Sequence, residues 1–236
     1  HRHIGAMKQT TKLPQKNVTI IGAGIAGCFM AILLAKRGYQ VDIYESRPDV
    51  RKHPYDSGRS FNLTLYYRGI QALRKAGVWT AVKKHAVIAE GNVAHYLVDE
   101  PVFDKFDARD NEMLYTIHRN GLNGALITEA EKLSGIKIYF DSKLISIDKA
   151  EKKFFIQKKG KSTPTVITTD LIIGADGVNS IVRSEMYKNI QASYSQTYED
   201  WGYKEVLIAP KMAKKLKLRE SATHTWPRVE SLLIGF

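Results

Sequence analysis

The stretch VTIIGAGIAGCFMAILLAKRGYQVDIYE, residues 18–45, decides the fold of this chain. The β-branched and apolar run from Val18 to Ile21 predicts a short strand, and three glycines at G-x-G-x-x-G spacing follow it. The mainly apolar run from Ile25 to Arg37 predicts a helix that ends at Gly38, and Gln40 to Tyr44 predicts a second strand. This order is typical of a β-α-β unit that binds a dinucleotide.

Each glycine of the turn has its own physical reason. Gly22 permits the tight turn, Gly24 lets the backbone approach a pyrophosphate because it has no Cβ, and Gly27 lets the helix pack closely on the strand. The N-terminus of the helix offers free N–H groups and a positive dipole to phosphates. Glu45 lies 18 residues after Gly27, where a carboxylate can accept hydrogen bonds from ribose hydroxyls. We therefore predict a bound adenine dinucleotide.

This stretch has two other interpretations. A glycine-rich turn of this kind also occurs in α/β proteins that bind no dinucleotide. Residues 18–35 are uncharged and just long enough for a transmembrane segment. Because three glycines interrupt that run and a β-branched segment precedes them, a buried strand, turn and helix explains it better.

The composition is that of an ordinary globular protein. The chain has 236 residues, of which 44% are hydrophobic and 25% charged, enough for one large domain or one and a half small ones. The single cysteine, Cys28, is expected in the core. It leaves no internal disulfide framework and no cysteine metal cluster, and it fits a reducing compartment. His85, His95, His118 and His224 are scattered, so we predict no metal site.

The net charge of +12 would attract nucleic acid, anionic membranes or anionic cofactors. The basic residues are spread along the chain rather than gathered in one arm, so we predict no nucleic-acid partner, and membrane contact is not indicated. The densest basic run, Lys211 to Arg219, is expected to form a solvated helical face. A patch for a partner or for lipid is the alternative for that run.

The two ends of the sequence carry expectations of their own. The first six residues, HRHIGA, resemble an expression-tag remnant, and the polar stretch from Met7 to Lys16 lacks the apolar run of a signal peptide. A cytoplasmic location is therefore expected. The final residues LLIGF are typical of the middle of a strand, so we expect the natural polypeptide to continue.

The rest of the chain continues an α/β pattern, with a weakly periodic excursion at 79–107. Periodicity and turn residues predict these further elements in chain order: a strand at 60–65, a helix at 68–76, a strand at 93–98, a strand at 113–117, a helix just after Arg119, four short strands between 136 and 168, a strand at 171–173, a short helix capped by Ser180, and a strand at 203–209.

Three motifs in this order resemble the flavin-dependent aromatic hydroxylases of the p-hydroxybenzoate hydroxylase type. They are GAGIAG with Glu45, Arg119 ahead of a helix, and the segment IIGADGVNSIVR. Within that family the chain is most similar to the kynurenine 3-monooxygenase branch, through GRSFNLTLYYRGIQALRKAGV, YTIHRNGLNGALITEAEK, GYKEVLIAP and HTWPR. The resemblance runs from about Asn17 to the end and covers roughly the N-terminal half of such an enzyme.

The resemblance implies an α/β fold class: a Rossmann-like FAD-binding domain with a three-stranded β excursion, and part of a β-sheet substrate domain. The FAD-binding domain is expected at 14–78 and 108–190, and the substrate sheet at 79–107 and 191–236. The implied activity is hydroxylation of an aromatic small molecule by an FAD-dependent monooxygenase, with O2 and a transient NADPH. Because the cofactor carries the hard chemistry, we predict no catalytic acid or base. The substrate and the choice of NADPH over NADH stay open.

The resemblance also assigns residues to the cofactor, and Arg47 and Arg59 are placed by the sequence to meet anionic groups. The implied roles are as follows: Gly22, Gly24, Ala26 and Gly27 at the pyrophosphate, Glu45 and Arg47 at the adenosine end, Thr64 and Arg119 against the cofactor, Leu144 near the adenine, and Asp176 at the ribityl-pyrophosphate region. The alternatives are a surface salt bridge for Arg119 and a turn-forming role for Asp176.

The chain departs from the family pattern in two respects. Matching enzymes hold the kynurenine carboxylate with an arginine and a tyrosine, whereas the candidate substrate-binding positions here are Asn92 and Phe106, which lack the charge and the hydroxyl. Arg109 is a candidate replacement. The family's G-D segment is expected beyond residue 236. Three alternatives therefore stay open: another flavin or nicotinamide oxidoreductase, a non-catalytic flavoprotein, and an incomplete enzyme that a second polypeptide segment completes.

Overall fold

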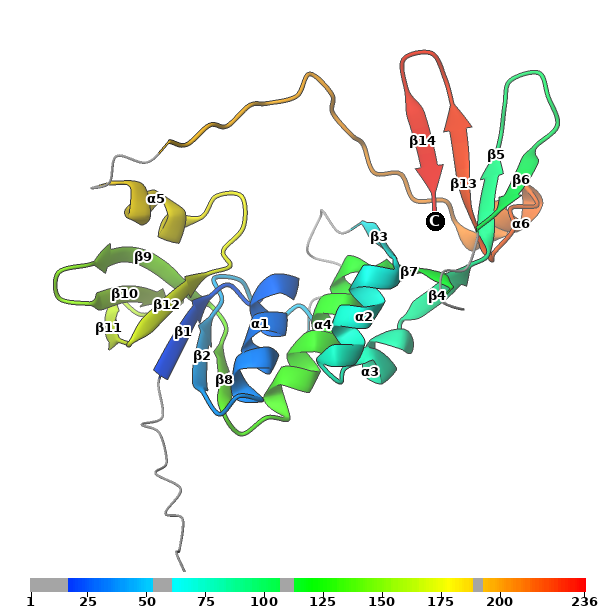
Figure 1. Ribbon diagram of the computed structural model, residues 1–236. Coiled ribbons are helices and arrows are strands. Elements are labelled where there is room, and N and C mark those ends of the chain that lie inside the picture. The colour runs from blue at the N-terminus through cyan, green and yellow to red at the C-terminus, as the bar shows by residue number, and fades with distance from the viewer. Residues whose placement is uncertain (1–16, 53–60, 107–112, 189–192) are drawn as a thin grey trace, which may run out of the picture.

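The computed structural model describes residues 17–52, 61–106, 113–188 and 193–236, and every structural statement below concerns these residues. Figure 1 shows a layered α/β body and a smaller sheet, which a long extended segment joins over the top. Within the described residues, no helix is both long enough and apolar enough to cross a membrane.

A parallel sheet forms the centre of the body. Its strands are β1 (Asn17–Ile21), β2 (Gln40–Tyr44), β8 (Ile136–Tyr139) and β12 (Leu171–Gly174), in the order β12-β1-β2-β8. One face is covered by α1 (Ile25–Ala35) and α4 (Arg119–Glu131), which pack against each other. Ile20 of β1 and Ile43 of β2 belong to the core on this helical face and are fully buried.

The second face of this sheet carries an antiparallel sheet of three strands. These are β9 (Ser142–Asp148), β10 (Lys153–Lys158) and β11 (Thr165–Thr168), in the order β11-β10-β9, and α5 (Ile181–Tyr187) packs beside β9. Successive side chains of a strand point to opposite faces. Ile21 and Tyr44 therefore turn away from the helices and form a second core cluster with residues of the three strands. The three-stranded excursion predicted from the family resemblance is confirmed.

A third group of elements extends the helical face. Strands β3 (Asn62–Leu65), β7 (Leu114–His118) and β4 (Ala86–Ala89) form an antiparallel sheet in the order β3-β7-β4. Helices α2 (Tyr67–Lys75) and α3 (Trp79–Lys83) connect β3 to β4, and their buried side chains include Ile70, Leu73 and Val82. The core on this side is continuous with the one beneath α1 and α4.

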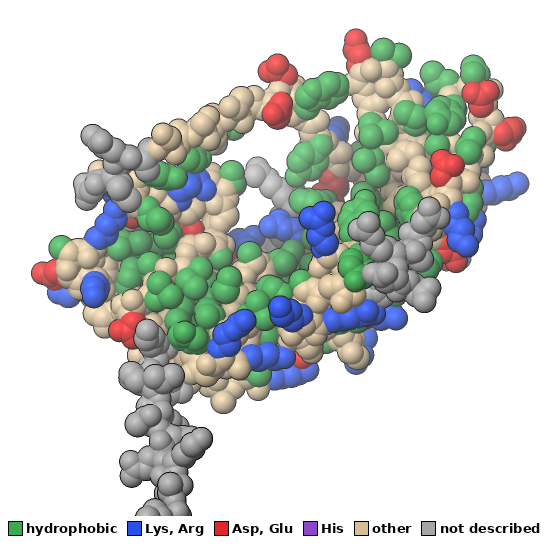
Figure 2. All heavy atoms as spheres, in the orientation of Figure 1, with side chains coloured by type: hydrophobic (Ala, Val, Ile, Leu, Met, Phe, Trp, Pro, Cys, Tyr) green, Lys and Arg blue, Asp and Glu red, His purple; other side chains and the backbone are tan. Residues whose placement is uncertain are grey.

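The smaller sheet combines two distant parts of the chain. Strands β5 (Gly91–Ala94) and β6 (Val102–Lys105) pair with β13 (Ala222–Pro227) and β14 (Leu232–Gly235), in the order β14-β13-β5-β6. Apolar side chains of β14 and of the segment 193–209 are exposed and appear in green on the upper part of Figure 2. The small helix α6 (Pro210–Lys215) has no buried residue, so the lysine-rich run is a solvated face as predicted.

Two predicted strands are wrong in part or in full, and three elements were not predicted. Residues 203–209 form no strand, because the described residues offer no neighbouring strand to pair with them. The strand expected at 93–98 begins at Gly91 and ends at Ala94. Residues 102–105, which were not predicted as a strand, pair with it as β6, and α3 and β4 were also missed.

Cys28 is a core residue, as predicted. Its thiol is fully buried on α1 and donates a hydrogen bond to the carbonyl oxygen of Ala23 at 3.2 Å. Burial raises the pKa of the thiol to about 12, so the group is protonated and unreactive at neutral pH.

Candidate functional site

The turn between β1 and α1 has a shape that only glycine allows at two of its three glycine positions. Gly22 has φ +103°, and a Cβ there would lie 2.4 Å from the carbonyl oxygen of Ala175. A Cβ on Gly27 would lie 1.9 Å from the carbonyl oxygen of Gly22. Gly24 differs, because a Cβ at that position would meet nothing within 4 Å. Gly22 and Gly27 therefore serve the fold, whereas the space beside Gly24 is open to a ligand.

Helix α1 starts directly at this turn. Gly24 is its N-cap residue and makes no side-chain capping bond, and the first turn of the helix has no acidic residue. Ala26, in that first turn, is exposed. The first N–H groups of a helix have no intrahelical partner and carry partial positive charge. The end of α1 is therefore suited to bind an anionic group.

Glu45 connects the end of β2 to the glycine turn. Its Oε2 accepts a hydrogen bond from the backbone N–H of Ala23 at 2.8 Å, and its Oε1 accepts from the backbone N–H of Arg47 at 2.9 Å. The Arg47 guanidinium also donates to Oε1 at 3.1 Å, although the Arg47 side chain is 63% exposed. Glu45 thus has a structural role that sequence reasoning, which assigned it only to a ribose, did not show.

Asp176 belongs to the turn that follows β12. Its carboxylate accepts hydrogen bonds from the Ser180 hydroxyl at 2.6 Å and from the backbone N–H groups of Ile181 and Val182 at 2.7 and 3.2 Å. Ser180 in turn accepts from the N–H of Arg183 at 2.9 Å, as a capping residue should. The carboxylate of Asp176 therefore caps α5, and its backbone lies beside Gly22.

The other predicted cofactor residues differ in how far they are exposed to solvent. Thr64 on β3 is opposite Thr116 on β7, and Arg119 is the exposed first residue of α4. The Arg119 guanidinium lies 5.8 Å from the ring centre of Phe61. Leu144 is 2% exposed and packs in the core between the two sheets. Arg59 lies outside the described residues.

The two candidate substrate residues lie on the smaller sheet. The Asn92 amide donates to the hydroxyl of Thr225 and accepts from the hydroxyl of Thr223, both at 2.9 Å. Phe106 follows β6, and its backbone N–H donates to the carbonyl oxygen of Glu90 at 2.9 Å. The Asn92 side chain is therefore engaged in holding β5 to β13. Arg109 lies outside the described residues.

The carboxyl end of the parallel sheet brings several of these groups together. β1 leads into the glycine turn, β2 ends at Glu45, and β12 leads to Asp176. The N–H of Gly22 donates to the carbonyl oxygen of Tyr44 at 2.8 Å, so two of these ends are directly bonded. Open α/β sheets bind ligands at this edge. Thr64 and Arg119 belong to the neighbouring sheet and helix, and Asn92 and Phe106 to the smaller sheet.

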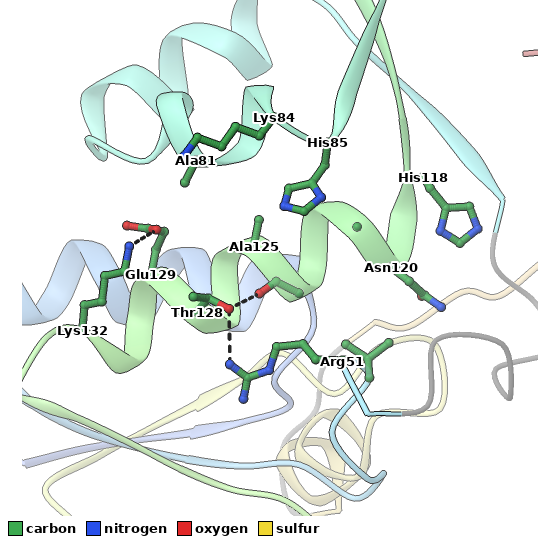
Figure 3. A pocket seen from close by; sticks show the side chains of 13 residues that line it. Arg51, Ala81, Lys84, His85, His118, Asn120, Ala125, Thr128, Glu129 and Lys132 are labelled. Carbon is green, nitrogen blue, oxygen red and sulfur yellow. Dashed lines mark hydrogen bonds and ion pairs between the residues drawn. The ribbon is translucent and has the colours of Figure 1, made fainter.

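A cavity of about 740 Å³ lies along α4, away from the glycine turn. Figure 3 shows His85 above α4 and Arg51 below it, with Asn120, Ala125 and Thr128 along the helix. Two of its cations are already paired: Arg51 with Asp49 and Glu131 at 2.6 Å each, and Lys132 with Glu129 at 2.5 Å. These ion pairs neutralise the charges of Arg51 and Lys132. The pairing around Arg51 was not predicted from the sequence.

Comparison with known proteins agrees with this geometry. A family model described as "FAD binding domain" matches residues 15–231. The chain belongs to this family of FAD-binding domains. It is 39% identical over 222 residues to kynurenine 3-monooxygenase of Xanthomonas axonopodis pv. citri, and 35% identical to that of Salinispora arenicola. Each match covers 94% of this chain, but only 48% and 49% of the relative. The chain therefore spans about half the length of the curated relatives it matches.

Solved structures of similar fold extend the comparison. A 2-methyl-3-hydroxypyridine-5-carboxylic acid oxygenase matches with a TM-score of 0.65 and 22% identity, over 92% of this chain and 53% of the other. The p-nitrophenol 4-monooxygenase PnpA from Pseudomonas putida matches with a TM-score of 0.61 and 19% identity, over 73% and 44%. At these identities the likeness shows the fold alone, and it confirms the predicted fold class of an FAD-dependent hydroxylase.

The residues present at the carboxyl edge of the sheet fit the cofactor of this family. FAD carries a pyrophosphate, an adenosine ribose and a flavin ring. The open space at Gly24 and the end of α1 suit the pyrophosphate, and the carboxylate of Glu45 stands at the tip of the next strand, where a ribose is expected.

A conservative change at Glu45 tests its double role. In Glu45→Gln the amide has one oxygen, so it can accept from Ala23 or from Arg47 but not from both. We expect a loss of about 1–2 kcal/mol in the free energy of unfolding and a rise of about tenfold in the dissociation constant for FAD. Urea denaturation followed by circular dichroism and titration of FAD fluorescence measure the two effects. Unchanged FAD affinity at reduced stability would leave Glu45 with the structural role alone.

Proposed function

We propose that this chain is the FAD-binding part of an aromatic-ring monooxygenase similar to kynurenine 3-monooxygenase, which uses NADPH and O2 to hydroxylate an aromatic small molecule. The observation that carries the proposal is the 39% identity to such an enzyme over 222 residues, which are 94% of this chain. The open space at Gly24 supports the nucleotide-binding part of the proposal.

The proposed roles of the residues follow from their positions. Bound FAD would supply the redox chemistry, while the protein binds and orients it. We assign the pyrophosphate to the turn of Gly22, Gly24, Ala26 and Gly27, in which Gly22 and Gly27 give the turn its shape and Gly24 leaves the open space. Glu45 and Arg47 belong to the adenosine end, Thr64 and Arg119 lie against the cofactor, and Asp176 belongs to the ribityl-pyrophosphate region. Asp176 would contribute through its backbone, because its carboxylate caps α5. Leu144 is a buried core residue and would pack near the adenine.

A second candidate function is a flavoprotein that binds FAD without hydroxylating kynurenine. It is favoured by the smaller sheet, where the amide of Asn92 is already bonded to Thr223 and Thr225 and where Phe106 has no hydroxyl. Neither side chain offers the cation that a buried substrate carboxylate needs. In this case the smaller sheet would help to bind another aromatic ligand, or it would bind no ligand.

The chain alone is expected to bind FAD weakly and to turn over little, because it spans 48% of the length of its relatives. We propose that a second polypeptide segment completes the enzyme. A longer polypeptide that also contains a counterpart of the rest of the relatives' length is expected to bind FAD at least about tenfold more tightly. Rapid hydroxylation by the isolated 236 residues would contradict this expectation.

The visible spectrum of the purified protein tests the proposal, with the mass of any released cofactor. A flavin spectrum and the mass of FAD are expected, and NADPH is expected to bleach the flavin. Faster bleaching in the presence of kynurenine would support the monooxygenase. FAD binding without any response to kynurenine would favour the second candidate. If neither the chain nor a longer polypeptide took up FAD, the flavin assignment would be wrong.

A further inference from the structure

The segment from Glu45 to Lys52 carries the proposed adenosine-binding groups and is attached to the body at both ends. At its start, the backbone N–H of Ser142 donates to the carbonyl oxygen of Glu45 at 2.7 Å, and that of Asp141 donates to Arg47 at 3.2 Å. Residues 46–48 are exposed between the two attachments. The position of the far end of the segment therefore depends on its second attachment.

Arg51 makes that second attachment. Its guanidinium forms a fork with the buried carboxylate of Asp49, through Nε at 2.9 Å and Nη2 at 2.6 Å. The same group forms a second fork with Glu131 on α4, through Nη1 at 2.6 Å and Nη2 at 3.0 Å. Nη1 also reaches the hydroxyl of Thr128 at 3.3 Å, as Figure 3 shows. Only arginine offers planar donors in this arrangement.

The surface of α4 is shaped to receive this side chain. A Cβ on Gly124 would lie 3.3 Å from Cγ of Arg51, so the aliphatic stem lies directly against the bare helix backbone. The Arg51 side chain is 29% exposed and that of Asp49 only 7%. The hydrogen bonds from Arg51 lower the pKa of Asp49 despite its burial, so Asp49 stays ionised until the pH falls below the usual carboxyl range.

These contacts form a closed series that includes the glycine turn. Glu45 is bonded to the glycine turn, the turn leads into α1, α1 packs on α4, and α4 holds Arg51. Arg51 then connects α4 to the segment that begins at Glu45. The first residue of α4 is Arg119, which the proposed function places against FAD.

We propose that Arg51 is a positioning residue for the FAD site: it fastens the segment that carries Glu45 and Arg47 to α4 and thereby holds the adenosine-binding groups in place. The inference rests on the proposed FAD binding. Arg51 is not proposed to contact the cofactor. It acts on FAD binding indirectly, because it joins the segment from Glu45 to Lys52 to helix α4.

The substitution Glu131→Gln distinguishes a positioning role of Arg51 from a simple attraction between its positive charge and the anionic FAD. FAD is an anion, so removal of a negative charge from α4 would tighten its binding if only the overall charge mattered. The positioning role predicts the opposite sign, because the fork to α4 is lost: the dissociation constant for FAD should rise about fivefold. The matched control is Glu129→Gln, which removes the same charge from the same helix but breaks only the pair with Lys132. We expect no weakening in that control.

Variants of Arg51 itself give the second part of the test. Arg51→Gln is expected to raise the dissociation constant about tenfold, and Arg51→Lys to restore part of the loss because it keeps one charged contact. The effects of Arg51→Gln and Glu131→Gln should not add in the double variant, since both break the same fork. ADP contains the adenosine end without the flavin, so its binding should weaken by the same factor as that of FAD.

The outcomes distinguish the two proposals. All titrations are made on the full chain at temperatures where circular dichroism shows each variant folded. If the parent chain binds FAD but Glu131→Gln binds it equally or more tightly, the positioning role is wrong and FAD binding stands. Loss of FAD affinity with unchanged ADP affinity would also overturn the positioning role. If neither the parent chain nor a longer polypeptide bound FAD or ADP, both proposals would be overturned.

Discussion

Gly27→Ala is expected to destabilise the fold of the chain severely. A Cβ at this position would lie 1.9 Å from the carbonyl oxygen of Gly22, which is more than 1 Å inside any tolerated contact. The Cβ is held in place by the helix backbone and the carbonyl is itself a backbone group, so neither can rotate away, and α1 would have to move away from the end of β1. We expect a loss of at least about 3 kcal/mol, a large part of the 5–15 kcal/mol that stabilises a typical domain.

Urea denaturation followed by circular dichroism measures this loss. The parent chain should show a cooperative transition, and the Gly27→Ala variant should show a transition at much lower urea or none. Gly202→Ala is the matched control, because a Cβ there would meet nothing within 4 Å and the segment belongs to no helix or strand. A Gly27→Ala variant as stable as the parent would mean that α1 does not approach the turn as closely as described.

Gly24→Ala is expected to have the reverse effect: the fold is kept and FAD binding is lost. A Cβ at Gly24 would meet no atom of the protein, and the φ of −70° suits alanine. At a helix N-cap, alanine costs at most about 1 kcal/mol relative to glycine. The added methyl group would occupy the space that we assign to the pyrophosphate, so the dissociation constant for FAD should rise at least about a hundredfold.

The test pairs titration of FAD fluorescence with the same urea experiment. The Gly24→Ala variant should unfold close to the parent and should quench FAD fluorescence only at much higher protein concentrations. Gly202→Ala again serves as the control and should bind FAD as the parent does. If Gly24→Ala binds FAD normally, the pyrophosphate does not approach the turn at Gly24, and the assignment of the pyrophosphate to this turn is wrong.

The β-α-β unit could be predicted from the sequence almost completely. The second strand was predicted at Gln40 to Tyr44 and lies there, and the first helix was predicted to begin at Ile25 and does. These elements are specified by local signals: β-branched runs, a glycine turn and a helix that ends before Gly38. The hairpin of β9 and β10 and the cap at Ser180 were predicted for the same reason.

Short strands were predicted poorly because their stability comes from their partners. β5 is four residues long and pairs with β13, where Asn92 is opposite Thr223 across a separation of 131 residues. β6 was missed, since its acidic and aromatic residues show no alternation. The apolar residues at 203–209 have strand composition, yet no neighbouring strand among the described residues pairs with them.

The sequence by itself determined the family and the fold class and predicted where a cofactor would bind, because the glycine turn and the later motifs are local signals that each act within about thirty residues. Only the tertiary structure decided what individual side chains do. It engages Asn92 with two threonines, turns the Asp176 carboxylate to α5, and joins Arg51 to Glu131 across 80 residues. A hydrogen bond between distant residues depends on how whole elements pack, and no local pattern in the chain records that packing.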